Sequence, residues 1–337
     1  MKAIRLREKG GPDKLVIAEV DTPMPGPGEV RVELKASALN RRDVWITLGL
    51  YPGLFFPTPP LGSDGAGIVD AVGEGVDEAL LGAGVVVYPA RDWGDDPSCG
   101  GPDFRVLGLP DDGTFADYIV AKANDVVAKP GHLDWHQAAA MPLAGLTAWR
   151  ALMTQAGLQD GESVLVTGIG GGVSTFAMLW GVHHGAKVYV TSSSKDKIVR
   201  AKSLGAAEGI NYKDDGWGKK AQKLTGGVDV VIDSTGGDAL HDYLDVLKPG
   251  GRMVIYGGTA GNPKQGLNVP KFFFRQISLK GSTMGTPDEF KAMIDYAELK
   301  KIEPVVDQVF PFSDAVAAHQ HVLDANQMGK VVLDHGR

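Results

Sequence analysis

Cysteine is nearly absent from this chain of 337 residues, and Cys99 is the only one. A single thiol excludes an internal disulfide and any zinc site built on several thiolates. Long apolar runs are missing too: no stretch reaches the roughly 18 residues that a membrane-spanning helix needs. The first residues, MKAIRLREKGG, lack the apolar core of a signal peptide. We therefore expect a cytoplasmic protein.

The chain also has fewer basic than acidic residues, 34 against 41. The formal net charge is −7, and a field of that sign does not attract nucleic acid or an anionic membrane surface. Hydrophobic residues make up 43% of the chain and charged residues 22%, as is usual for a globular protein. We expect small-molecule partners, no nucleic acid and no membrane, and the length favours two domains.

The middle of the chain combines an apolar strand, a glycine-rich turn and a helix. Residues 164–166 form a short apolar run typical of a strand covered on both faces, and Phe176 and Trp180 recur at helical spacing after the turn. Glycine permits positive φ and lets a pyrophosphate approach the backbone at the helix N-terminus. A tight structural turn would use the same residues. We predict a dinucleotide site that includes Gly168, Gly170, Gly171, Gly172 and Val173.

A carboxylate is missing where an NAD-binding fold places one. Ser192 lies twenty positions after Gly172, and Ser193 follows it. An Asp or Glu there would bind the ribose 2′-hydroxyl of NAD and repel the 2′-phosphate of NADP, whereas hydroxyls and lysines accommodate the phosphate. We therefore favour NADPH over NADH. The alternative is that Ser194, the next residue, is the N-cap of the following helix, and both roles can hold together.

From the glycine turn onward, short apolar strands alternate with helical patterns. Candidate strands are residues 209–212, 228–232, 253–256 and 277–279. This alternation predicts an α/β fold with a doubly wound parallel sheet. Because ligands lie beyond the carboxyl ends of such strands, several loop residues are expected near the cofactor, although ordinary turn chemistry explains each of them as well. They are Ser234, Thr235, Tyr256, Gly257 and Gly258.

The first part of the chain has a different pattern. Val30, Val32 and Leu34 alternate with polar residues as in a half-buried antiparallel strand, and glycine and proline punctuate the region. A last strand, residues 330–333, is expected to return to this β-rich part. We predict a β-rich domain over residues 1–125 and 285–337, with a nucleotide-binding domain over residues 126–284 inserted near its C-terminal part.

Motifs along the whole chain resemble the medium-chain dehydrogenase/reductase superfamily, and within it the zinc-independent quinone oxidoreductase (zeta-crystallin-like) branch. The resemblance implies a GroES-like catalytic domain, a Rossmann domain and the use of NAD(P)H. It also implies that Thr147 lies near the nicotinamide, Lys197 and Tyr212 near the 2′-phosphate, and Lys330 near the cofactor. The motifs are ALNRRDVW (38–45), GLYPG (49–53), LGSDGAGIV (61–69), DGTFADYIV (112–120), MPLAGLTAW (141–149), VTGIGGGVS (166–174), LGAAEGINY (204–212), LKPGGRMVIYG (247–257) and GKVVL (329–333).

The chain departs from the zinc alcohol dehydrogenases that it resembles. The positions of their catalytic zinc ligands carry Asn40, Ser63 and Leu143, and the proton-relaying hydroxyl falls at Arg42. Asn, Ser and Leu do not form a tight zinc site of nitrogen and sulfur ligands. We therefore expect no zinc.

Without a Lewis acid, oxidation of a simple alcohol is disfavoured, because the pKa of its hydroxyl proton is far above neutral pH. A quinone or activated enone accepts hydride to give a delocalised oxyanion that a few hydrogen-bond donors stabilise. The expected function is therefore metal-free reduction of a quinone or enone by NADPH. The candidate catalytic residues are Asn40, Asp43 and Tyr51, each of which has an equally plausible structural role.

Two other functions are kept as alternatives. One is a zinc alcohol dehydrogenase with unrecognised ligands, and the other is a protein that binds NADPH without turnover. The resemblance also implies a homodimer, because members of the superfamily commonly pair their Rossmann sheets edge to edge.

Overall fold

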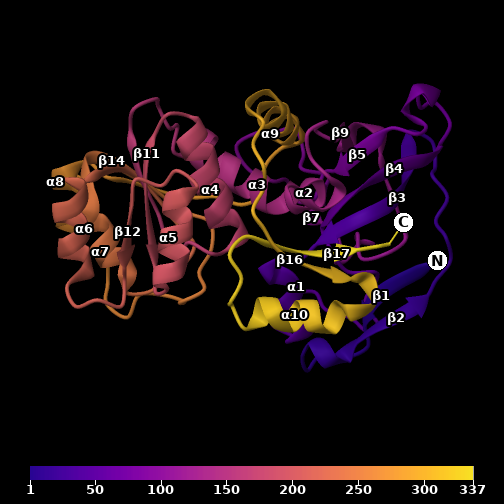
Figure 1. Ribbon diagram of the computed structural model, residues 1–337, viewed down its shortest axis with the longest axis horizontal. Helices are drawn as coiled ribbons and strands as arrows, with labels where there is room; N and C mark the ends of the chain where they lie inside the picture. Colours follow the sequence, from indigo (N-terminus) through magenta and orange to yellow (C-terminus); the bar gives the residue numbers. More distant parts are fainter. Residues whose placement is uncertain (337) are drawn as a thin grey trace. The chain divides into compact units, whose positions relative to one another are not determined.

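The computed structural model describes residues 1–336, whose contacts divide into two compact units. The first comprises Met1–Leu146 and the segment that begins at Gly285, and the second comprises Thr147–Met284. Figure 1 labels their helices and strands. No helix among residues 1–336 is both long enough and apolar enough to cross a membrane.

A seven-stranded sheet forms the centre of the first unit, with strand order β16-β17-β3-β4-β5-β9 and β8 paired with β3. In β3, Val30, Val32 and Leu34 are fully buried while the residues between them are partly exposed, which confirms the predicted alternation. The strands are β3 (Glu29–Ala38), β4 (Asp64–Val72), β5 (Gly84–Val87), β8 (Tyr118–Lys122), β9 (Val126–Ala128), β16 (Val306–Pro311) and β17 (Lys330–Asp334).

Helices and two small hairpins complete this unit. Thr286 caps α9 and accepts a hydrogen bond from the Glu289 amide, as the capping-box pattern TPDE requires. The helices are α1 (Arg41–Thr47), α2 (Trp135–Ala140), α9 (Pro287–Lys300) and α10 (Ala315–Leu323). The hairpins pair β1 (Lys2–Leu6) with β2 (Leu15–Glu19) and β6 (Ala90–Arg91) with β7 (Arg105–Val106).

The boundary between the units differs from the predicted one. Residues 126–146 were assigned to the nucleotide-binding domain, but their contacts place them in the first unit. Strand β9 pairs with β5, and α2 packs on β3 and β4. Helix α2 therefore covers the sheet of the first unit, which its local sequence does not indicate. Helix α3 (Pro142–Trp149) contains the boundary itself.

The second unit contains a six-stranded parallel sheet with strand order β12-β11-β10-β13-β14-β15. Chain order runs outward in both directions from the β10–β13 pair, so the prediction of a doubly wound sheet is confirmed. Its strands are β10 (Ser163–Val166), β11 (Lys187–Ser192), β12 (Glu208–Asn211), β13 (Val228–Asp233), β14 (Leu247–Ile255) and β15 (Ser278–Gly281). Its helices are α4 (Gly172–His183), α5 (Lys195–Ser203), α6 (Trp217–Thr225), α7 (Ala239–Val246) and α8 (Val269–Arg275).

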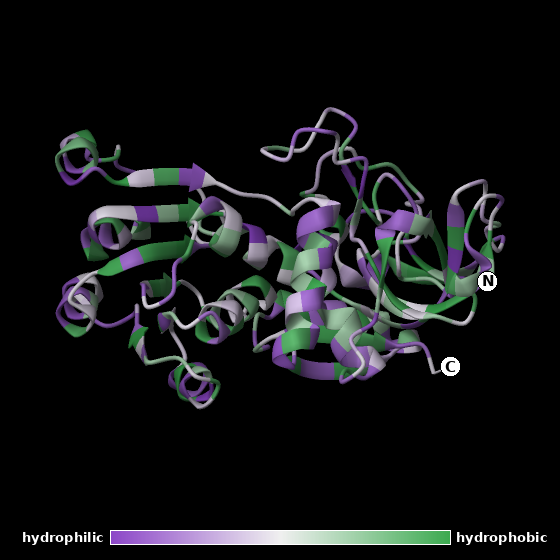
Figure 2. Ribbon diagram, turned by 90° about the horizontal axis from the view of Figure 1, so that it is seen from above, coloured by the Kyte–Doolittle hydropathy of each residue, from purple (hydrophilic) through white to green (hydrophobic). Residues whose placement is uncertain are grey.

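The burial of this sheet follows from its sequence. All four residues of β10 are buried, as are five of the six in β11, because helices cover the sheet. Figure 2 shows helices that carry both hydrophilic and hydrophobic residues, which is expected when one helix face packs on a core. Edge strand β15 is exposed along its whole length.

Candidate active site

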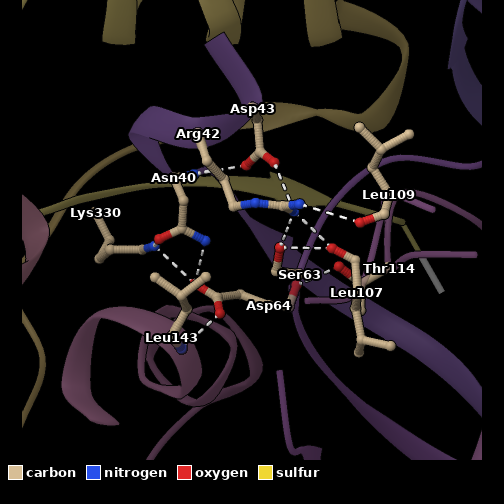
Figure 3. Close-up of polar contacts among 10 residues, drawn as sticks. All are labelled: Asn40, Arg42, Asp43, Ser63, Asp64, Leu107, Leu109, Thr114, Leu143 and Lys330. Carbon is tan, nitrogen blue, oxygen red and sulfur yellow. Dashed lines mark hydrogen bonds and ion pairs between the residues drawn. The ribbon is translucent and has the colours of Figure 1, made fainter. Parts of the chain in front are cut away.

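Three strands of the first unit bring a buried polar cluster together. Asn40 follows β3, Asp64 begins β4 and Lys330 begins β17. Strand β3 pairs with both of the other strands, with Ala38 opposite Asp64 and Val332, so the three residues meet at one end of the sheet. Their exposed fractions are only 8%, 0% and 3%. Figure 3 shows the three side chains pointing toward one another.

Hydrogen bonds close this cluster, which we call the Asn40–Asp64–Lys330 cluster. Lys330 Nζ donates to Asn40 Oδ1 and to Asp64 Oδ2, both at 2.7 Å. Asn40 Nδ2 donates to Asp64 Oδ2 at 2.9 Å, and the Leu143 amide donates to Asp64 Oδ1 at 2.7 Å. A buried carboxylate is thus compensated by an ammonium and by two neutral donors, as burial of a charge requires.

Arg42 is a second buried cation beside this cluster. Its Nη1 donates to Ser63 Oγ at 2.8 Å and to the Leu107 carbonyl at 2.6 Å. Its guanidinium lies over the Tyr51 ring, 4.7 Å from the ring centroid, which is a cation–π distance. Sequence reasoning placed Arg42 only as a replacement for a relay hydroxyl. Its helical spacing from the buried Ile46 was the available signal that it faces inward.

Asp43 belongs to the cap of α1. It is the N3 residue of a capping box, and its Oδ2 accepts a hydrogen bond from the Asn40 amide at 2.8 Å. Its side chain is fully buried, and burial raises the pKa of Asp43 to about 6, opposed by the nearby Arg42. The predicted catalytic role of Asp43 therefore competes with a structural role that accounts for its position.

The glycine turn of the second unit has two glycines with positive φ and leads directly into α4. Gly168 and Gly170 have φ of 63° and 131°, in the region that favours glycine. Gly171 is the N-cap of α4, and Gly172 and Val173 form its first turn. No side chain among residues 1–336 caps this helix, so the free amides and the positive dipole end remain for an anion.

The loops after β13 and β14 adjoin this turn through Asp233. This buried carboxylate accepts hydrogen bonds from Thr167 Oγ1 at 2.7 Å, Thr235 Oγ1 at 2.5 Å and the Gly236 amide at 2.8 Å. The Tyr256 amide donates to the Asp233 carbonyl. Sequence reasoning also placed Asp233 among the loop residues near the cofactor, but it did not predict that this carboxylate organises the others.

Gly257 and Gly258 follow Tyr256 after the end of β14. A Cβ on Gly257 would lie 3.0 Å from the Ser234 carbonyl oxygen, so this glycine allows the loops after β13 and β14 to approach each other. Gly258 has open space around its Cβ position. The structure gives a packing reason for the first glycine only.

The residues predicted at the ribose phosphate gather at the ends of β11 and β12. Ser192 pairs with Asn211, and the Tyr212 amide donates to the Ser192 carbonyl at 3.2 Å. Ser193 is exposed, and Lys197 lies in the first turn of α5. The Ser192 hydroxyl already accepts a hydrogen bond from the Ser194 amide, and Ser194 caps α5. The N-cap alternative is therefore present in the structure. The residues predicted to bind the 2′-phosphate also lie close together, so the two roles do not exclude each other.

Two other predicted cofactor residues lie elsewhere. Thr147 is nearly buried, with 6% exposure, and is the first residue of the second unit. Lys330 lies in the first unit, where Asn40 and Asp64 hold its ammonium. The local structure thus gives Lys330 a position that the resemblance did not imply, and its contact with the cofactor stays a prediction.

Models of two known protein families match the chain. One is described as an alcohol dehydrogenase GroES-like domain and matches residues 26–131, and the other is described as a zinc-binding dehydrogenase and matches residues 172–298. The protein named zinc-type alcohol dehydrogenase-like protein YogA of Leptosphaeria maculans is 38% identical, with 94% of this chain and 93% of that protein covered. The chain belongs to the medium-chain dehydrogenase/reductase superfamily.

Two further relatives extend this comparison. A quinone oxidoreductase of Pseudomonas aeruginosa is 32% identical to this medium-chain dehydrogenase/reductase, with 98% of this chain and 99% of that protein covered. A crystal structure described as an NAD-dependent alcohol dehydrogenase is 39% identical, has a TM-score of 0.93 and covers both chains completely. The GroES-like domain, the Rossmann-type sheet and the NAD(P)-dependent oxidoreductase class are therefore established.

The residues at the expected zinc position do not fit zinc. The Asn40 oxygen accepts from Lys330, the Ser63 hydroxyl donates to the Leu107 carbonyl at 2.9 Å, and Leu143 contributes an amide to Asp64. Zinc sites use Cys, His or carboxylate ligands. No group of three such residues among residues 1–336 is arranged to hold a metal ion. The buried ammonium of Lys330 would also repel a divalent cation.

Proposed function

We propose that this medium-chain dehydrogenase/reductase reduces quinones or activated enones with NADPH and without a metal ion. The observation that carries the proposal is the Asn40–Asp64–Lys330 cluster at the position expected for zinc. NADPH, when bound, supplies a hydride. Asn40 uses one side-chain N–H on Asp64 and keeps a second to bind an acceptor oxygen. Such donors suit a delocalised oxyanion better than an alkoxide.

Tyr51 is the second residue proposed at the acceptor. Arg42 lies against its ring, which fixes the orientation of the ring and leaves it available to stack on a planar quinone. The relative named quinone oxidoreductase supports this substrate class. The structure named NAD-dependent alcohol dehydrogenase supports a second candidate, an alcohol dehydrogenase, because it covers the whole chain at higher identity.

Steady-state kinetics distinguish the candidates. Purified protein is mixed with NADPH or NADH and a panel of quinones and enones, and separately with NAD⁺ or NADP⁺ and aliphatic alcohols. With the first panel we expect oxidation of the reduced cofactor at a rate that dialysis against a chelator does not lower. Metal analysis should find less than about 0.1 zinc per chain. Turnover of simple alcohols together with about one zinc per chain would establish the dehydrogenase instead. Binding of NADPH without any turnover would indicate a module that only binds the cofactor.

The preference for NADPH is tested at Ser192. In Ser192→Asp the new carboxylate still accepts the Ser194 amide but repels a 2′-phosphate, so the KM for NADPH should rise at least tenfold and that for NADH should not. The matched control is Ser192→Asn, which has the same size without the charge. It should change either KM by less than about threefold. Equal effects of Asp and Asn would contradict a phosphate site here.

We further propose that the protein forms a homodimer through the second unit. Edge strand β15 is exposed, and Phe273 and Phe274 of α8 are 60% and 77% exposed. An exposed strand edge beside apolar side chains is a favourable site for pairing with a second copy. Light scattering during size-exclusion chromatography should give twice the monomer mass, and Leu279→Lys, at the edge strand, should give the monomer. A wild-type monomer at micromolar concentration would refute this proposal.

A further inference from the structure

The first unit contains two buried cations near Asn40, and their remaining bonding capacity differs. The Arg42 guanidinium is covered by the Tyr51 ring and donates to Ser63 and to two main-chain carbonyls. The bonding of its two Nη atoms is therefore directed into the protein, and its Nε is buried without a hydrogen-bond partner in the described part of the chain. Lys330 donates to Asn40 and Asp64, and an ammonium carries three N–H groups. One N–H of Lys330 thus has no partner among residues 1–336.

Lys330 lies beside two of the three positions at which the zinc alcohol dehydrogenases carry metal ligands. Its Nζ contacts the side chain of Asn40, which occupies one of the expected ligand positions, and shares Asp64 with the amide of Leu143, which occupies another. A metal at such a position would stabilise negative charge on a substrate oxygen. A fixed ammonium in the same place provides the same sign of charge, with a directed hydrogen bond in addition.

We propose that Lys330 is a catalytic residue that stabilises the acceptor oxyanion in place of a Lewis acid. This inference rests on the proposed function. As the hydride of NADPH reaches the β-carbon of an enone, the C=C π-electron pair forms the C=C bond of the enolate and the carbonyl π-electron pair moves to the oxygen. The free N–H of Lys330 and the second amide N–H of Asn40 then bind this oxygen, and water supplies the proton that completes the product. Asp64 is a positioning residue that holds both donors. The 3% exposure of Lys330 suits approach by a single small atom such as a carbonyl oxygen.

The proposal predicts that removal of the Lys330 ammonium lowers kcat by a factor that depends on the acceptor. In Lys330→Met, kcat should fall at least a hundredfold with an enone such as 2-cyclohexenone and less than tenfold with 1,4-benzoquinone, whose product anion is already delocalised. The Kd for NADPH, measured by its fluorescence, should change less than threefold. Lys122→Met is the matched control, because it removes the same charge from an exposed lysine of the same unit. Its kcat should stay within twofold.

Lys330→Met leaves the Asp64 charge buried alone, so folding requires its own control. The double variant Lys330→Met/Asp64→Asn removes both charges and keeps an acceptor for the Leu143 amide. In this folded variant the acceptor-dependent loss should persist, and alkylammonium added to Lys330→Ala should restore enone reduction in part.

Three results would overturn the inference: an unchanged kcat in the folded double variant, an equal loss with all acceptors, or a loss that follows a rise in the Kd for NADPH. The last would indicate that Lys330 binds the cofactor. If the wild-type protein reduced no acceptor, the proposed function itself would be refuted. The catalytic role of Lys330 would then be refuted as well.

Discussion

Replacement of Gly168 by valine is expected to lower the affinity for NADPH at least a hundredfold. Gly168 has φ of 63°, a conformation that a β-branched residue strongly disfavours. A Cβ there would lie 3.5 Å from Ser234 Oγ and 3.9 Å from Thr235 Cγ2, which are ordinary contacts. The damage therefore comes from strain in the turn and from a side chain where the pyrophosphate approaches, rather than from a clash with the protein. Titration of NADPH fluorescence measures this loss.

Gly157 is the matched control for this variant. It has φ of 59°, belongs to the same unit, and its Cβ position has no heavy atom within 4 Å. Gly157→Val should therefore lose a similar stability, about 1–2 kcal/mol of unfolding free energy, but keep its affinity for NADPH. Equal affinities of the two valine variants would show that the glycine turn is purely structural.

Replacement of Arg42 by methionine is expected to cost about 3–5 kcal/mol of unfolding free energy, because it leaves a buried carboxylate without its cation. Arg42 Nη1 lies 3.9 Å from Asp43 Oδ1, and the two side chains are 8% and 0% exposed. The variant also leaves Ser63 and the Leu107 carbonyl without the Arg42 donor. Arg41→Met is the matched control, since this adjacent arginine is exposed and, among residues 1–336, donates to the main-chain carbonyls of Val322 and Leu323. It should cost less than about 1 kcal/mol.

The second partner can be removed as well. In Arg42→Met/Asp43→Asn no buried charge remains, so part of the lost stability should return, and a double-mutant cycle measures the coupling. Urea unfolding at pH 8 is suitable for the wild-type protein, Arg42→Met, Asp43→Asn and the double variant. If Arg42→Met and Arg41→Met were equally stable, the charge of Asp43 would be compensated elsewhere.

The raised pKa of Asp43 makes the free energy of unfolding depend on pH. The pKa of Asp43 is raised from 3.8 to about 6, so the folded protein binds this proton more tightly than the unfolded chain does. Between these values stability falls as pH rises, because the folded state must bury the new charge. Relative to Asp43→Asn, the wild-type protein should therefore lose up to about 3 kcal/mol between pH 4 and pH 7. A constant difference across this range would contradict the raised pKa.

Much of the second unit could be predicted from local sequence because its signals are short in range. Strand β10 consists of four buried residues, and its run of valine and leucine predicts such a strand. The glycines that follow predict a turn with positive φ. The missing carboxylate at Ser192 was equally visible. Whether Ser192 faces a phosphate or serves the turn was not, since its hydroxyl bonds to an amide two residues away in either case.

In the first unit, the residues of the candidate site are far apart in the sequence. Asn40, Asp64 and Lys330 are separated by as many as 290 positions, and no local pattern indicates that β3 lies between β4 and β17. Motif comparison therefore assigned Lys330 to the cofactor and Arg42 to a lost relay. The predicted boundary at residue 125 differs from the structure for a related reason, because the packing of α2 on β3 and β4 has no local signature.

The sequence by itself determined the elements: which segments are strands or helices, and where glycine is required. These depend on propensity, periodicity and residue chemistry, all of which are local. Only the tertiary structure decided which charges meet. The pairing of β3 with β4 and β17 places a carboxylate, an amide and an ammonium within hydrogen-bonding distance, because strand pairing joins residues regardless of their separation along the chain.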